Sequence, residues 1–197
     1  MSSILKINEF RNNSLLATIF SQFSWALHAS SVGLILSRFT QIFDGIPTVL
    51  PVPEEAPPEI PRILLQSSDK QWILEISNSR LNYRWVQMAE THQQSLASFV
   101  GQFCRFWSDF RAIQTLKVGR VALVSSRYYL IDRPAFVLAN HFSKDIWLQK
   151  GLGESASFEI HGHRKTKIGQ DFDVNSWIRF KSAYLTIPNT LIAPLSW

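Results

Sequence analysis

The sequence is poor in cysteine and in charged residues, and it contains no long hydrophobic run. Its one cysteine, Cys104, excludes an internal disulfide and any metal site built from several cysteines. Because Cys104 lies in an apolar helical pattern, we expect a buried thiol. No apolar stretch approaches the ~18 residues of a membrane-spanning helix, and residues 1–14 lack the apolar segment of a signal peptide. We therefore expect a cytoplasmic protein that does not enter a membrane.

Sequence motifs of known catalytic sites are missing as well. The chain contains no G-x-S-x-G, no Walker phosphate loop, no G-x-G-x-x-G, no H-E-x-x-H and no zinc-deaminase signature. The carboxylate pairs Glu54/Glu55 and Asp171/Asp173 fall in segments typical of solvated loops. We therefore expect a protein that is not an enzyme and that holds no cofactor.

Apolar and aromatic residues are abundant. Hydrophobic residues make up 46% of the 197 positions and aromatic residues 13%, with seven tryptophans, which is enough for a packed core. Charged residues account for only 18%, against a usual value of ~25%. The net charge of +5 is compatible with a phosphate-bearing partner. Low charge with many tryptophans favours a surface that a protein partner partly covers, because Trp and Arg are enriched at interfaces.

The composition along the chain indicates three segments. Residues 1–13 are expected to be flexible, residues 14–187 to form a single α+β domain, and residues 188–197 to form a C-terminal tail. Residues 45–61 hold six of the nine prolines. Because proline lacks a backbone donor, we expect an extended connector there.

Hydrophobic periodicity predicts the order β-α-β-β-β-α-β-α-β-β, an α+β fold with a mainly antiparallel sheet and two or three helices packed on one face. Asp132 is expected to cap the third helix. The predicted strands are 15–23, 62–67, 71–77, 80–86, 118–131, 157–168 and 175–187, and the predicted helices are 28–43, 93–113 and 134–142.

The stretch from Trp72 to Trp85, WILEISNSRLNYRW, alternates between apolar and polar residues. One face of this predicted hairpin carries Trp72, Leu74, Ile76, Leu81, Tyr83 and Trp85, and the other carries Glu75, Arg80, Asn82 and Arg84. An antiparallel sheet can leave one face in contact with water or with a partner. Arg80 and Arg84 are therefore candidates for binding a carboxylate or a phosphate.

The predicted strand 157–168 suggests two further sites. His161 and His163 share a face and could reach one metal ion with a third ligand from Glu159, Asp171, Asp173 or His141, as in a metal-dependent hydrolase. The basic stretch 163–167 contains Arg164, Lys165 and Lys167. These three side chains favour an alternative function, a nucleic-acid-binding accessory protein.

Several blocks together resemble a known family. They are EIPRILLQSSDKQWILEISNSRLNYRW, an amphipathic helix, VGRVALVSSRYYL and NSWIRFKSA, with matching positions at Leu74, Ile76, Arg80, Asn82, Trp85, Arg120, Asn175 and Trp177. The combination is similar to a sporadically distributed, functionally uncharacterised prokaryotic protein family, over most of residues 15–183. Its members usually continue further at the C-terminus. The resemblance implies the same order of elements and no particular activity.

The leading expectation is a non-enzymatic interaction protein, a subunit of a bacterial protein complex or a homo-oligomer. Trp177 and Trp197 are the candidate interface residues, because exposed tryptophans are favoured anchors at protein interfaces. The alternatives are the nucleic-acid-binding accessory protein and the metal-dependent hydrolase.

Overall fold

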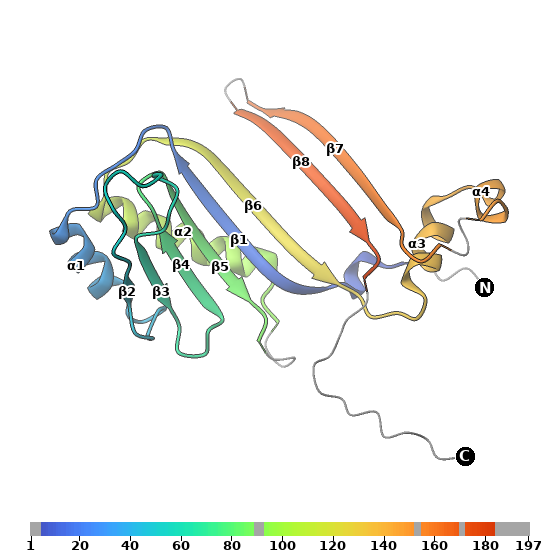
Figure 1. The fold of residues 1–197 in the computed structure, drawn as a ribbon, viewed down its shortest axis with the longest axis horizontal. Coiled ribbons are helices and arrows are strands. Elements are labelled where there is room, and N and C mark those ends of the chain that lie inside the picture. The colour runs from blue at the N-terminus through green and yellow to red at the C-terminus, as the bar shows by residue number, and fades with distance from the viewer. Residues whose placement is uncertain (1–4, 89–92, 152–154, 170–171, 184–197) are drawn as a thin grey trace, which may run out of the picture. The chain divides into compact units, whose positions relative to one another are not determined.

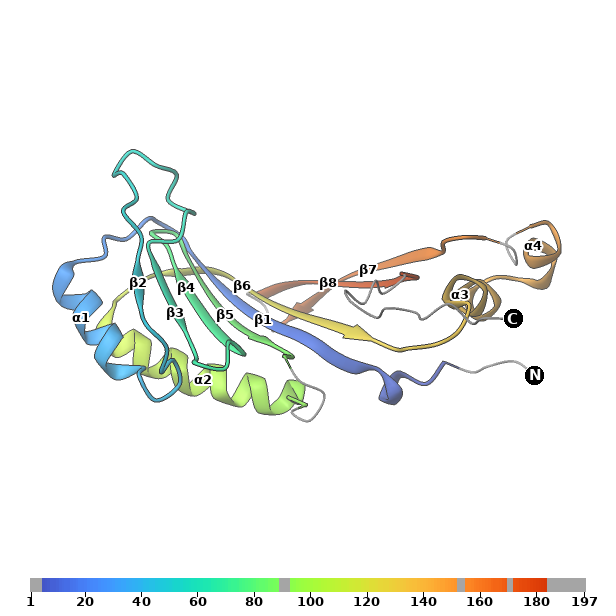
Figure 2. The same ribbon diagram turned by 60° about the horizontal axis from the view of Figure 1, so that its bottom comes forward.

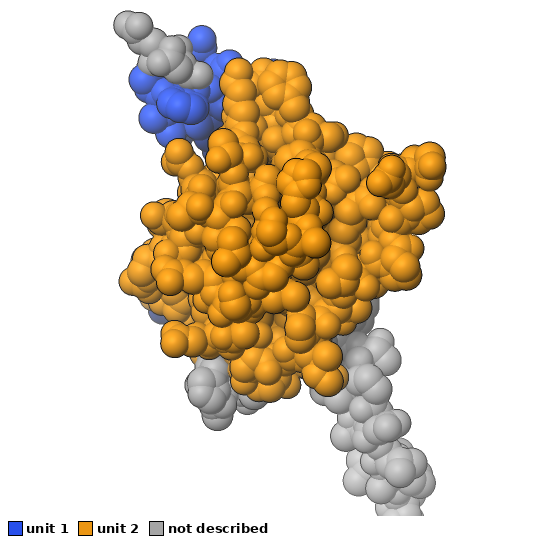
Figure 3. All heavy atoms as spheres, turned by 90° about the vertical axis from the view of Figure 1, so that its left-hand side faces the viewer, with its two compact units in different colours: residues 1–7, 130–197 blue, residues 8–129 orange. Residues whose placement is uncertain are grey.

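The computed structural model describes residues 5–88, 93–151, 155–169 and 172–183. The chain divides into two compact units, Asn8–Tyr129 and Met1–Ile7 with Leu130–Trp197, which Figure 3 colours separately. The expectation of a single domain over 14–187 stays a prediction, and the predicted tail 188–197 lies outside the described residues.

The unit Asn8–Tyr129 contains a six-stranded sheet in the order β2-β3-β4-β5-β1-β6, in which every neighbouring pair is antiparallel (Figure 1). Two helices lie on one side of this sheet (Figure 2). The strands are β1 (Arg11–Ser21), β2 (Thr48–Val49), β3 (Ile63–Gln66), β4 (Trp72–Ile76), β5 (Arg80–Val86) and β6 (Val118–Tyr128), and the helices are α1 (Ala29–Arg38) and α2 (Leu96–Ile113).

Four of these strands and the two helices follow a recurrent arrangement. The chain passes from β1 through α1 to the β4–β5 hairpin, then through α2 to β6, and the strands lie in the order β4-β5-β1-β6. This is the connectivity and strand order of a split βαβ, or βαββαβ, motif. The β2–β3 pair extends the sheet beyond β4. Both helices cover the same face of the sheet (Figure 2). No helix that the structure describes in this unit covers the opposite face, which we call the open face.

The apolar–polar alternation of residues 72–85 sets the register of the β4–β5 hairpin as predicted. Trp72 pairs with Trp85, Leu74 with Tyr83 and Ile76 with Leu81, and of these six side chains all but Trp72 are buried. A slip of one residue would turn this whole set away from the helices. The predicted polar face, with Arg80 and Arg84, is therefore part of the open face.

Helix α2 covers the hairpin with a stripe of phenylalanines. Ser95 caps its N-terminus, with Oγ accepting a hydrogen bond from the Ser98 N–H. The buried residues of α2 are Phe99, Phe103, Phe106 and Phe110. The predicted burial of Cys104 is wrong, because its thiol is exposed. One residue after Phe103, Cys104 is rotated by about 100° around the helix, away from the buried stripe.

The proline-rich connector contains a strand that the sequence did not predict. β2 has only two residues and pairs with β3. The Arg62 guanidinium donates hydrogen bonds to the carbonyls of Val52 (3.0 Å) and Pro53 (3.3 Å), which hold the loop after β2. At the start of the connector, a Cβ on Gly45 would lie 2.5 Å from the Gln66 carbonyl oxygen, so only glycine permits this close approach.

The second unit contains two helices and a hairpin. These are α3 (Pro134–Phe142), α4 (Asp145–Gln149), β7 (Glu159–Ile168) and β8 (Phe172–Lys181), and Phe142 packs on Phe180 with ring centroids 5.1 Å apart. The predicted cap by Asp132 is wrong. The residue before α3 is Arg133, in the left-handed region at φ 52° and ψ 55°, and it makes no side-chain cap.

The predicted α+β class with a mainly antiparallel sheet is confirmed. The observed order is β-α-β-β-β-β-α-β-α-α-β-β, which adds β2 and the short α4 to the predicted order. β1 begins at Arg11, within a segment expected to be flexible, because its first residues already pair with β6.

Candidate interaction surfaces

β6 forms the longer of the two edges of the sheet. It pairs with β1 on one side, and no strand in the described part of the chain pairs with its other side (Figure 1). Its sequence VGRVALVSSRY contains no proline. Large apolar side chains on it are exposed on both faces: Val121 by 57%, Leu123 by 50% and Val124 by 52%. A long apolar edge of this kind is a template for a further strand.

The opposite edge, β2, is built differently. It has two residues, Thr48 and Val49, and Pro47 and Pro51 lie close to them on either side. Proline cannot donate a ladder hydrogen bond, and short edge strands with prolines are a common protection against strand addition. One edge of the sheet is thus short with prolines beside it, and the other is long and free of proline.

A polar row crosses the centre of the open face. Thr18, Asn82 and Glu75 lie directly opposite one another on β1, β5 and β4. Thr18 Oγ1 donates to Asn82 Oδ1 (2.9 Å), and Asn82 Nδ2 donates to Glu75 Oε2 (2.8 Å). Thr18 and Asn82 are buried, so the row satisfies polar groups that would otherwise cost free energy. Asn82 therefore has a structural role.

Next to this polar row, Arg80, Phe20 and Arg120 form a second row across the open face. Phe20 on β1 is opposite Arg80 on β5 and opposite Arg120 on β6. The Arg120 guanidinium lies 3.9 Å from the centroid of the Phe20 ring. Arg80 is half-buried, and its Nε is buried without a hydrogen-bond partner among the described residues. The predicted anion candidates Arg80 and Arg84 thus share the open face, with Arg84 opposite Leu16 beyond the polar row.

A depression of about 590 Å³ lies on the helix side of the sheet, beside Tyr83. The Tyr83 hydroxyl is buried and has no hydrogen-bond partner in the described part of the chain. Burial raises the pKa of this phenol far above its ordinary value, and the nearby charge of Arg105 opposes the shift. The rim carboxylates are already engaged: Asp44 accepts from Ser68, Asp69 from Ser67 and Asp109 from Arg38.

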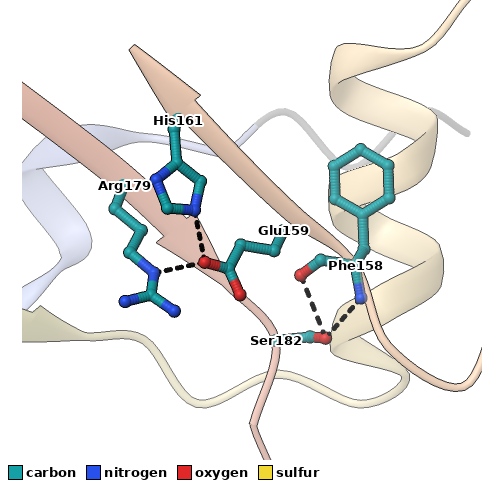
Figure 4. Close-up of polar contacts among 5 residues, drawn as sticks. All are labelled: Phe158, Glu159, His161, Arg179 and Ser182. Atoms are coloured by element: carbon teal, nitrogen blue, oxygen red, sulfur yellow. Dashed lines mark hydrogen bonds and ion pairs between the residues drawn. The ribbon is translucent and has the colours of Figure 1, made fainter. Parts of the chain in front are cut away.

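The polar face of the β7–β8 hairpin carries a cluster around Glu159 (Figure 4). One oxygen of its carboxylate accepts from both Arg179 and His161, which come from β8 and β7 (Figure 4). The Arg179 guanidinium and then the His161 ring lower the pKa of Glu159. Nearby, the Ser182 hydroxyl accepts from the Phe158 N–H at 2.8 Å and so closes the end of the hairpin (Figure 4).

The other predicted hairpin residues are distributed over both faces. His163 stacks on Trp177, with ring centroids 3.9 Å apart, and Trp177 is 69% exposed. Lys165 and Lys167 share that face, and Lys167 lies 3.7 Å from the Asp173 carboxylate. Arg164, one residue from Lys165, points to the opposite face, so the basic stretch 163–167 does not form one continuous patch. Trp197 lies outside the described residues.

His161 and His163 do not converge on a shared ligand set. Across residues 5–88, 93–151, 155–169 and 172–183, no group of three or more His, Cys, Asp or Glu side chains is placed to hold a metal ion. Glu159, the nearest carboxylate, already binds a guanidinium, which a metal would have to displace. Asp171 lies outside the described residues.

None of the helices in the described part of the chain is both long enough and apolar enough to cross a membrane. No protein-family model matches the sequence, and no curated protein matches it. The resemblance noted from the sequence therefore stays a prediction.

Sequence reasoning missed two features of these surfaces. The pairing of Phe20 with Arg80 and Arg120 joins three distant segments, and no local pattern marks it. The edge position of β6 depends on which strand pairs with which, although its uncharged centre, VALVSS, was a visible signal for an exposed template.

Proposed function

We propose that this chain is a non-enzymatic interaction protein, a subunit of a protein complex or a homo-oligomer, that binds its protein partner by strand addition to β6. The observation that carries the proposal is the difference between the two edges of one sheet. β2 is short and has prolines beside it, whereas β6 is eleven residues long and has none.

Strand addition suits the chemistry of this edge. Main-chain hydrogen bonds to an incoming strand supply affinity, and side chains that alternate between the two faces supply specificity. On β6, Val121 and Leu123 point to the helix side, and Val124 points to the open face, as their partners on β1 show. An incoming strand would cover all three of these exposed apolar side chains, which favours association.

The test compares the two edges within one protein. The double variant Val121→Lys/Leu123→Lys places charges on the β6 edge, which is how natural edges avoid pairing. The control Val49→Lys places a charge on the exposed β2 edge. Tagged proteins are purified from the native host with nuclease present, and the recovered proteins are identified by mass spectrometry. Sedimentation velocity of the purified chain tests self-association.

We expect the wild type and Val49→Lys to recover the same partner or to self-associate to the same extent. The β6 double variant should lose that partner or that self-association. Equal recovery by all three proteins would contradict strand addition at β6. A monomeric wild type with no partner would contradict the interaction function as a whole.

The nucleic-acid reading of residues 163–167 has less support, because Arg164 and Lys165 point to opposite faces and Lys167 faces Asp173. The hydrolase reading has less support because Glu159 is held by Arg179.

A further inference from the structure

Two pairs of a cation with an aromatic ring lie at one end of the sheet. The Arg120 guanidinium lies 3.9 Å from the centroid of Phe20, and Lys117 Nζ lies 5.8 Å from the centroid of Phe23. Phe20 and Phe23 are three residues apart, at the end of β1 and just after it. Cations stacked on aromatic rings are a feature of surfaces that bind single-stranded nucleic acid.

Backbone hydrogen bonds hold this end of β1 in place. The Ser21 N–H donates to the Ser79 carbonyl before β5, and the Gln22 N–H donates to the Lys117 carbonyl before β6. Gly119 allows β6 to approach closely, since a Cβ there would lie 3.2 Å from the Gln22 backbone. Phe23 follows directly and is 64% exposed. The ring is therefore carried by an anchored backbone while its surface is open to solvent.

The cations at this end are not neutralised by acids. Among the residues that the structure describes, no carboxylate forms an ion pair with Arg80, Lys117 or Arg120. Arg80 lies on the other side of Phe20 from Arg120, and its buried Nε has no hydrogen-bond partner there. Arg80 as a whole is only half-buried, and a guanidinium forms charge-assisted hydrogen bonds with phosphate oxygens.

The stacking surfaces of the site favour a single strand over a duplex. Stacking on Phe23 and on the Arg120 guanidinium needs bases with free faces, which a duplex does not offer. Four-stranded RNA-binding sheets stack bases on aromatic side chains of a sheet face. The βαββαβ strands here have both helices on the other face (Figure 2). A fold does not imply a function, so the proposed binding rests on the side chains at this end of the sheet.

We propose that Phe20, Phe23, Arg80, Lys117 and Arg120 form a binding site for single-stranded nucleic acid at this end of the sheet. Bases stack on Phe23 and on the Arg120 guanidinium, and the phosphates contact Arg80 and Lys117. The site uses none of the residues of the hairpin stretch 163–167, and it does not rest on the strand addition proposed for β6, the strand to which Arg120 belongs.

Fluorescence anisotropy tests the site with labelled single strands of about 16 nucleotides, the upper end of typical site sizes. RNA and DNA of the same sequence are titrated over a range of salt concentrations, with an unlabelled duplex as competitor. The variants are Phe23→Ala, Arg80→Gln and Arg120→Gln. The charge-matched controls are Arg111→Gln, exposed on α2, and Lys165→Gln on β7. Thermal melts establish that each variant is folded.

We expect the wild type to bind, and the titrations show whether it prefers RNA or DNA. Phe23→Ala should weaken binding by about fivefold or more, as loss of one stacked base does, with an unchanged salt slope. Arg80→Gln should weaken binding and reduce the salt slope by about 0.7, the value for one lost phosphate contact. Both controls should bind like the wild type.

The proposal would be overturned by no binding at low salt, by equal loss of affinity in the controls and in the Phe23, Arg80 and Arg120 variants, or by loss of affinity in Lys165→Gln alone. Equal competition by the duplex would also contradict a single-strand site. None of these results bears on the β6 edge, which is tested with nuclease present.

Discussion

β5 and β6 flank the same strand, β1, and differ almost completely in burial. Ala17 lies opposite Tyr83 of β5 on one side and opposite Leu123 of β6 on the other. Tyr83 is fully buried, whereas Leu123 is 50% exposed. The backbone pairing is equivalent, so the difference comes from what covers the side chains. β5 lies under the phenylalanines of α2, and β6 lies at the edge of the sheet. Pairing alone does not make a strand part of the core.

The largest effect should separate these two residues. Tyr83→Ala removes the ring at the centre of the aromatic cluster, and we expect the free energy of unfolding to fall by about 3–5 kcal/mol, as for other buried aromatic truncations. Leu123→Ala should change it by less than about 0.5 kcal/mol. Urea unfolding of both variants checks this. Equal losses would mean that β6 is covered in the folded protein.

The second comparison uses the two residues opposite Thr18, which are Asn82 on β5 and Ala122 on β6. Asn82→Ala breaks hydrogen bonds to Thr18 and Glu75 and leaves a buried hydroxyl without its partner. We expect a loss of about 1–3 kcal/mol in unfolding free energy. Ala122→Ser should stay within about 0.5 kcal/mol of the wild type. An unchanged stability for Asn82→Ala would show that the polar row is not structural.

A smaller effect should come from the Tyr83 hydroxyl. Because it is buried without a partner in the described part of the chain, Tyr83→Phe removes an unsatisfied group and keeps the ring. We expect the free energy of unfolding to be unchanged or higher by about 1 kcal/mol. A clear loss of stability would mean that the hydroxyl has a partner such as a buried water.

These comparisons also show what the sequence could predict. The register of the β4–β5 hairpin follows from strict alternation, because a slipped register would expose Trp85. β2 could not be predicted, since two residues among prolines carry no periodic signal, and α4, with five residues, is too short for one. The edge position of β6 and the Phe20–Arg120 pair both depend on long-range strand order, and the only local signal for either was the uncharged centre of β6, VALVSS.

The smallest effect should come from the hairpin β7–β8, where a polar cluster lies at the surface. The pKa of Glu159 lies below its ordinary value of 4.5 because Arg179 and His161 bind its carboxylate. A lowered pKa means that this contact stabilises the hairpin above about pH 4.5, and that the contribution is lost as the pH falls through the folded-state pKa. An NMR titration of the Glu159 carboxyl should show this lowered midpoint, and Arg179→Gln should raise it. Equal midpoints would mean that the ion pair is absent in solution.

The most direct test of strand addition at β6 is amide hydrogen exchange. It compares the free chain with the chain bound to the partner that copurifies with it from its host. Addition of a strand to β6 would occupy its outward backbone groups, so peptides from 118–128 should exchange more slowly in the complex. Peptides covering β2 should exchange at the same rate in both states. Protection confined to other segments, with β6 unchanged, would contradict the account.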